Sequence, residues 1–315
     1  VLDRRMVVAV AAGAGLGGVY NAPLAGMFFA VEILLVDVTL EKVAFGLGMS
    51  ATAAFVATAI KGEHMFYDIG AMQMNSTPSL MLFALLCGTA CGVVGALFRK
   101  GSQWAESHKP TGRSLMWQMP IAGLVTGLVS IVVPQVMGNG RAAAQLGFST
   151  FIPETADTSD AAQSAASAAA SPWTFLAGSD GAPGSVVNAG TPLELNRLWM
   201  LLGVLALTFV AKALVTLMTI RSGASGGVLQ PGIALGSTLG TMLGLLWLFV
   251  FPVDSVTACA LIGAAALLSA SQQAPLMAMC LVMELTEAPF EFFVPVGMAV
   301  AASAFVSSGL LHRLG

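Results

Sequence analysis

Hydrophobic and polar positions divide this chain into long apolar stretches separated by short polar or glycine-rich segments. An α-helix needs about 20 residues to cross the hydrocarbon core of a bilayer. Several of the apolar stretches reach that length, so we predict that they form membrane-spanning helices. The apolar stretches cover residues 6–36, 43–60, 78–98, 115–137, 198–220, 226–251, 256–285 and 289–311.

Polar or helix-breaking residues interrupt three of these stretches, at Asn21-Ala22-Pro23, Ser225-Gly226-Gly227 and Gln272-Gln273-Ala274-Pro275. Inside a bilayer, such breaks are tolerated only where the backbone is buried in protein or lines a water-filled cavity. Broken helices near the middle of the membrane are typical of transporters. The predicted fold class is therefore an all-α, multi-pass integral membrane bundle of tilted, partly broken helices, which we expect in the cell membrane.

Composition supports lipid as the solvent of this protein. Hydrophobic residues make up 57% of the 315 positions and charged residues 9%, whereas a typical soluble domain has about 25% charged residues. The net charge of −3 provides no basic stripe, so we exclude a nucleic-acid partner. The four cysteines lie in apolar stretches and the three histidines form no ligand set. We therefore expect no metal site and no cofactor.

Charge and composition also predict the arrangement of the linkers. Arg99, Lys100, Lys109 and Arg113 form a basic loop, which the positive-inside rule places in the cytoplasm. The stretch 150–197 is rich in Ala, Ser and Gly and poor in large hydrophobic residues, so we predict a flexible, external loop. The expected organisation is membrane helices over 1–149, an inserted loop over 150–197, and the helices of a second repeat with the anion filter over 198–315.

An internal repeat relates two distant parts of the chain. A shift of 252 residues aligns Ala22-Pro23-Leu24 with Ala274-Pro275-Leu276 and Glu32 with Glu284. Transporters built from two such halves place the substrate site between them; chance similarity in an Ala-rich membrane protein is the alternative. An acid in an apolar helix is costly, and we interpret Glu32 and Glu284 as structural acids that bond to loop backbone, with a functional role as the alternative.

Three glycine patterns predict close contacts between helices. Small residues spaced four apart lie on one helix face and let two backbones approach. The patterns are Gly88-xxx-Gly92, Gly123-xxx-Gly127 and Gly236-xxx-Gly240-xxx-Gly244.

Enzyme motifs do not account for this chain. Gly13-Ala14-Gly15-Leu16-Gly17-Gly18 matches G-x-G-x-x-G, but a dinucleotide site also needs alternating strands and amphipathic helices. The sequence contains no Walker phosphate loop, no H-E-x-x-H and no G-x-S-x-G. We therefore assign no catalytic residue and expect no enzyme, so a membrane enzyme is the disfavoured alternative.

The glycine-rich segment 222–232 opens directly into an apolar helix near Val228. The first turn of a helix has unpaired N–H groups and a partial positive charge, and glycines before it allow close approach. Such dipoles can bind chloride and still release it; a break made only for packing is the alternative. We predict anion binding at Gly226, Gly227, Val228 and Leu229, with Ser225, Pro231, Asn21, Pro23 and Pro275 supporting the pore.

Three ordered motifs resemble those of the chloride channel (CLC) family. They are Gly15-Leu16 through Asn21-Ala22-Pro23-Leu24-Ala25-Gly26 to Glu32, then Ser225-Gly226-Gly227-Val228-Leu229-Gln230-Pro231, then Gln273-Ala274-Pro275-Leu276 to Glu284-Leu285-Thr286. The resemblance implies the inverted-repeat CLC fold, a homodimer with one pore per subunit, and chloride coordinated by the backbone amides of Val228 and Leu229.

Departures from the family pattern affect the predicted mechanism. The family's pore serine, gating glutamate and pore tyrosine fall outside this sequence, so we expect it to be incomplete at both ends. Leu229 stands where the family has Phe, and Ile33 stands where its proton-coupled exchangers often have an internal proton-accepting Glu. Because Ile cannot titrate, this position favours a chloride channel. The alternatives are a proton-coupled chloride or fluoride antiporter and, in another class, a non-conducting membrane assembly or sensor protein.

Overall fold

A computed structural model describes residues 3–62, 66, 67, 69, 77–149, 195–224, 226–248, 250, 251 and 254–314. Within these residues the chain forms helices and no strand. The elements are α1 (Arg4–Tyr20), α2 (Pro23–Phe28), the π-helical η1 (Phe29–Leu35), α3 (Leu40–Lys61), α4 (Pro78–Ser107), η2 (Gly112–Ser114), α5 (Leu115–Val132), η3 (Pro134–Val136), α6 (Arg141–Ser149), α8 (Leu195–Arg221), α9 (Leu229–Trp247), α10 (Val256–Gln272), α11 (Pro275–Thr286), η5 (Phe290–Phe292) and α12 (Phe293–Leu314).

Six of the described helical segments are long and apolar enough to cross a bilayer. They are 40–61, 78–107, 112–132, 198–221, 229–247 and 290–313. Shorter apolar helices lie between them, at 23–35, 256–272 and 275–286. The predicted all-α, multi-pass membrane class is confirmed.

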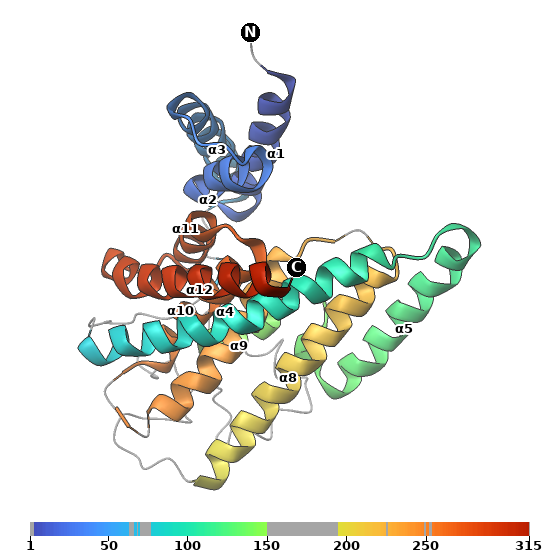
Figure 1. Cartoon of the computed structure of the whole chain (residues 1–315), viewed down its shortest axis with the longest axis vertical. Helices are drawn as coiled ribbons and strands as arrows, with labels where there is room; N and C mark the ends of the chain where they lie inside the picture. Colours follow the sequence, from blue (N-terminus) through green and yellow to red (C-terminus); the bar gives the residue numbers. More distant parts are fainter. Residues whose placement is uncertain are drawn as a thin grey trace.

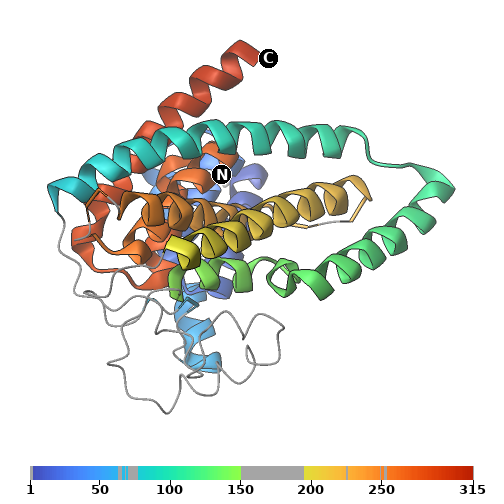
Figure 2. The ribbon, with the colours of Figure 1, turned by 90° about the horizontal axis from the view of Figure 1, so that it is seen from below.

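Helix α10 lies at the centre of the bundle. Sixteen of its 17 residues are buried, and it packs against α4, α9, α11 and α12. Figure 1 shows α1, α2 and α3 grouped at one end of the molecule, beyond α11. Figure 2 shows α8 between α4 and α5. An apolar helix this short is thus surrounded by protein rather than by lipid.

Glycines allow the closest helix contacts, as two of the three patterns predict. A Cβ at Gly236 or Gly240 would clash with the backbone of α10, and one at Gly88 or Gly92 with the backbone of α12. Among the described residues the third pattern makes no such contact: a Cβ at Gly123 or Gly127 would meet none of their atoms within 4 Å, because α5 is exposed along most of its length. For this pattern the close contact stays a prediction.

The repeat predicted from sequence is present in the backbone. Asn21 ends α1 with φ 52°, and Gln273 ends α10 with φ 57°. The next residues, Ala22 (φ −129°, ψ 75°) and Ala274 (φ −134°, ψ 80°), also match. A proline then begins each short helix, where its missing N–H costs nothing. The shared Ala-Pro-Leu is therefore a repeated turn rather than a coincidence.

The two repeated acids hold the copies together reciprocally. The Glu284 carboxylate accepts hydrogen bonds from the Leu24 and Ala25 N–H groups at 2.9 and 2.8 Å. Glu32 accepts from the N–H groups of Leu276 and Met277 at 3.2 and 2.8 Å. Each acid thus caps the first turn of the other copy's short helix, where negative charge is favoured, instead of bonding to a nearby loop.

Two boundaries differ from the sequence prediction. Arg99 and Lys100 lie within α4, which continues to Ser107, so the basic segment is a helix end followed by a short turn and not a loop throughout. Helix α8 begins at Leu195, so the last three residues of the predicted loop, 195–197, are helical. The rest of that loop, residues 150–194, lies outside the described residues, and the division into three regions stays a prediction.

Candidate functional site

The predicted filter segment meets the start of α9. Val228 is the N-cap and Leu229 the first helical residue, and no side chain caps this helix start within the described residues. Pro231, at the third helical position, has no N–H to leave unpaired. The first intrahelical bond runs from the Gly232 N–H to the Val228 carbonyl. The amide donors without an intrahelical acceptor therefore belong to Val228, Leu229 and Gln230, together with the positive end of the helix dipole.

The two glycines before α9 are exposed and leave space. A Cβ at Gly226 or Gly227 would meet nothing within 4 Å, and neither residue has a positive φ. The left-handed backbone occurs earlier, at Gly223 (φ 88°), in the turn where its N–H bonds to the Ile220 carbonyl at 3.2 Å. Gly226 and Gly227 therefore matter here because they lack a side chain that would fill the space, and not because their backbone needs a left-handed conformation. Ser225, predicted to support the pore, lies outside the described residues.

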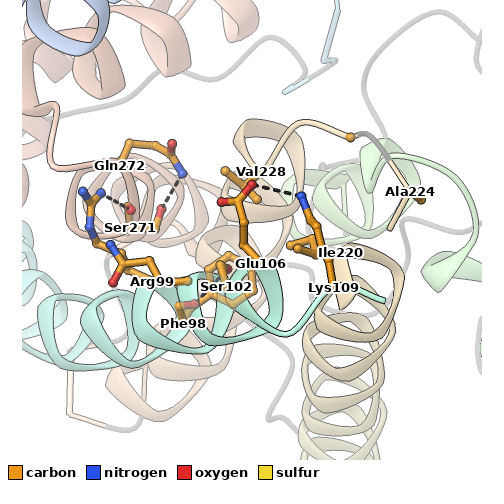
Figure 3. A pocket seen from close by; sticks show the side chains of 12 residues that line it. Phe98, Arg99, Ser102, Glu106, Lys109, Ile220, Ala224, Val228, Ser271 and Gln272 are labelled. Atoms are coloured by element: carbon orange, nitrogen blue, oxygen red, sulfur yellow. Dashed lines mark hydrogen bonds and ion pairs between the residues drawn. The ribbon is translucent and has the colours of Figure 1, made fainter. Parts of the chain in front are cut away.

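A cavity of about 340 Å³ opens beside this helix start. Gly226 and Val228 line it together with side chains from α4 and the end of α10. Figure 3 shows Arg99, Glu106 and Lys109 around the cavity, with Val228 beside the Glu106–Lys109 pair. Gly226 and Val228 therefore share this cavity with the end of α4 that carries the basic residues.

A buried hydrogen bond anchors the first turn of α9 from the other side. Tyr67 Oη donates to Gln230 Oε1 at 2.6 Å, and the Tyr67 N–H donates to the Leu285 carbonyl at 3.1 Å. Burial raises the pKa of Tyr67, so its phenol stays protonated and remains the donor. Gln230 is 4% exposed, and its Nε2 has no partner among the described residues.

Lys212 places a positive charge near the same helix turn. It is 3% exposed, and its Nζ donates to the Val136 and Gly138 carbonyls at 2.8 Å each. Within the described residues no carboxylate pairs with it. A Cβ added at Gly140 would lie 3.2 Å from Lys212 Cε and 3.4 Å from the Gln230 carbonyl oxygen, so both groups approach this glycine.

Sequence reasoning missed both Tyr67 and Lys212. A signal existed for Lys212, because a lysine inside a long apolar helix is a functional candidate by default. No comparable signal marked Tyr67, which reaches Gln230 across 163 residues of sequence.

The other predicted residues lie away from the α9 cavity. Pro23 and Pro275 begin α2 and α11, next to the amides that Glu284 and Glu32 cap. Asn21 lines a second cavity of about 140 Å³, where its Oδ1 accepts from Thr58 Oγ1 at 3.0 Å. Ile33 is half-buried against the main core. The structure thus places Gly226 and Val228 on the α9 cavity, with Gly227 and Leu229 adjacent in sequence but not among its lining residues. Asn21, Pro23 and Pro275 lie at the repeated turns.

The sequence profile of the family described as "Voltage gated chloride channel" matches residues 1–308. The chain belongs to this family. Membership of the CLC family explains the repeated turns and the glycine-rich segment before α9, both of which carried the resemblance seen in the sequence.

Curated CLC relatives are similar over most of this chain. The H(+)/Cl(-) exchange transporter ClcA of Yersinia pestis bv. Antiqua (strain Angola) is 27% identical over 296 residues, which cover 90% of this chain and 51% of the relative. The ClcA protein of Yersinia pseudotuberculosis serotype O:3 (strain YPIII) matches equally. The chain therefore spans about half the length of the curated relatives it matches.

Solved CLC structures share the fold. A slow cyanobacterial Cl⁻/H⁺ antiporter matches with a TM-score of 0.70 and 20% identity, covering 98% of this chain and 64% of that one. A CLC-type fluoride/proton antiporter matches with a TM-score of 0.63 and 18% identity, covering 96% and 63%. These similarities confirm the predicted CLC fold; at such identities they show the fold alone.

Proposed function

We propose that this chain forms the part of a CLC transporter that contains the backbone-amide anion site, and that the whole protein exchanges a small anion for protons across a membrane. The start of α9 carries this proposal: no side chain caps it, and its N-cap residue Val228 lines a cavity. Chloride is the first candidate substrate, and the bilayer and a second copy of the chain are the expected partners.

Exchange is preferred to the channel predicted from Ile33. The ClcA relatives and two of the similar structures are described as proton-coupled transporters of chloride or fluoride. Ile33 still cannot carry a proton, so exchange here requires a proton-accepting group at another position. Fluoride remains an alternative substrate because one of the similar structures is a fluoride/proton antiporter.

Reconstituting the full-length protein into liposomes tests the proposal. Chloride efflux and internal pH are recorded together, with fluoride and nitrate as comparison anions. Proton movement in fixed proportion to anion movement is expected. Efflux without proton movement would restore the channel interpretation, and no flux of any anion would favour a non-transporting role.

A substitution tests the assignment of the site. Gly227→Val fits the backbone and the free space around this residue, yet it places a branched side chain where the anion approaches the amides. We expect anion flux to fall at least about tenfold, the size of a change near 1.4 kcal/mol in the barrier. Gly203→Val is the matched control, because Gly203 is also exposed and has nothing within 4 Å of an added Cβ. Equal flux in the two variants would contradict the assignment.

A further inference from the structure

The cavity beside α9 is lined by three charged residues, all from α4 and the turn after it: Arg99, Glu106 and Lys109. Residues 99, 102 and 106 lie on one face of α4 because they follow the spacing i, i+3, i+7, and this face lines the cavity. Glu106 Oε1 pairs with Lys109 Nζ at 3.0 Å. The pair is close to neutral as a unit, so Arg99 supplies the net positive charge of the cavity.

The Arg99 guanidinium has more N–H donors than the one hydrogen bond described for it uses. Its Nη1 donates to the Ser271 carbonyl at 2.9 Å, near the end of α10, where a cation is favoured. A guanidinium has five N–H donors and cannot lose its proton in a protein. Within the described residues no carboxylate pairs with Arg99. Figure 3 shows its guanidinium beside Ser271 and Gln272, apart from the Glu106–Lys109 pair.

We propose that Arg99 is the anion-capture residue of this cavity, and that Glu106 limits capture by holding Lys109 in an ion pair. A positive charge in a cavity with protein walls raises the local concentration of a small anion. Gly226 and Val228 line the same space, so an anion held near Arg99 lies in the cavity that also reaches Val228, the N-cap residue of α9. A cation at the cavity rather than at the filter gathers the anion without binding it tightly at the amides. This inference rests on the proposed transport function.

The two residues are expected to act in opposite directions. Arg99→Gln removes the net positive charge, and we expect it to raise the apparent KM for chloride on this side of the membrane about threefold at low ionic strength, with little change in maximal rate. Glu106→Gln frees Lys109 and should lower the same KM by about the same factor. Both effects should shrink at high ionic strength, because salt screens charges in an open cavity.

Chloride flux in liposomes of the full-length protein measures these changes, with potassium gluconate used to set ionic strength. Arg113→Gln is the matched control, since Arg113 is an exposed cation on the turn after α4 and does not line the cavity. An Arg99→Gln effect equal to that of Arg113→Gln, or one insensitive to salt, would overturn the proposal. So would a Glu106→Gln variant whose KM rises.

A second measurement separates charge from folding. In an Arg99→Cys variant, a thiol reagent that adds an ammonium group should restore low KM, whereas one that adds a sulfonate should raise it further. The four native cysteines are buried, which favours reaction at position 99. Identical results with both reagents would show that Arg99 acts only as a cap for α10. Absence of flux of chloride, fluoride and nitrate in the unmodified wild-type protein would instead contradict the proposed function itself.

Discussion

The turn between α1 and α2 and the turn between α10 and α11 have the same backbone in very different surroundings. Helices α1 and α10 both have 17 residues, yet six are buried in α1 and 16 in α10. Both helices nevertheless end in a left-handed residue followed by Ala-Pro. Local sequence therefore sets the break and the restart of the helix, while the position in the bundle sets how much of each helix is buried.

The largest difference in stability cost between equivalent positions of the two repeats should appear at Gly263 in α10. Gly263 faces Gly236 and Gly240 across the α9–α10 contact. Gly263→Val would press a side chain against the backbone of α9, and we expect a loss of about 3 kcal/mol in stability. Ala11→Val is the matched control: it occupies the equivalent position in α1 and is exposed, so we expect a change within about 0.5 kcal/mol. Thermal unfolding of the full-length protein in detergent measures both; equal Tm values would show that the copies tolerate side chains equally.

The reciprocal caps should give an intermediate effect. Glu284→Ala leaves the Leu24 and Ala25 amides without their acceptor, and we expect a loss of about 1 to 2 kcal/mol. Glu32→Ala should cost slightly less, because one of its two bonds is longer, 3.2 Å against 2.9 Å. The same Tm measurement ranks the two variants. Unchanged stability in both variants would show that the Glu32 and Glu284 caps do not stabilise the contact between the two repeats.

The smallest expected difference concerns the left-handed residues. Gly adopts this backbone readily, so Asn21→Gly should change stability by no more than about 0.5 kcal/mol despite losing the bond from Thr58. Gln273→Gly should cost about 1 kcal/mol, because Gln273 Nε2 donates to the Ala270 carbonyl at 2.8 Å and to Ser307 Oγ at 2.9 Å. A larger loss of stability for Asn21→Gly than for Gln273→Gly would contradict this prediction.

Features encoded by local sequence were predictable. The apolar stretches indicated the membrane helices, the Ala-Pro-Leu motif indicated the repeated turns, and the glycines before Val228 indicated an open helix start. Each depends on propensity, backbone freedom or hydrophobicity over a few residues. The family resemblance supplied the arrangement of these pieces in one fold.

Contacts between distant residues were not predictable in the same way. The repeat drew attention to Glu32 and Glu284, but only the three-dimensional arrangement shows that each caps the other copy's helix. The charge of Arg99 ends the apolar run and so predicts a loop at this position, whereas α4 continues beyond it to Ser107. A long side chain can reach a carbonyl on a neighbouring helix, here that of Ser271, and sequence spacing does not reveal such a neighbour.

The reciprocal caps also bear on how the protein is made. Leu24 is separated by 260 residues from its acceptor in Glu284, and the ribosome adds about 5 to 20 residues each second. The start of α2 therefore waits roughly 13 to 50 seconds for its cap during synthesis. Over that interval the Leu24 and Ala25 amides have no Glu284 carboxylate to accept their hydrogen bonds. The two repeats can therefore be joined by these caps only after α11 has been synthesised, when Glu284 can reach α2 and Glu32 can reach α11.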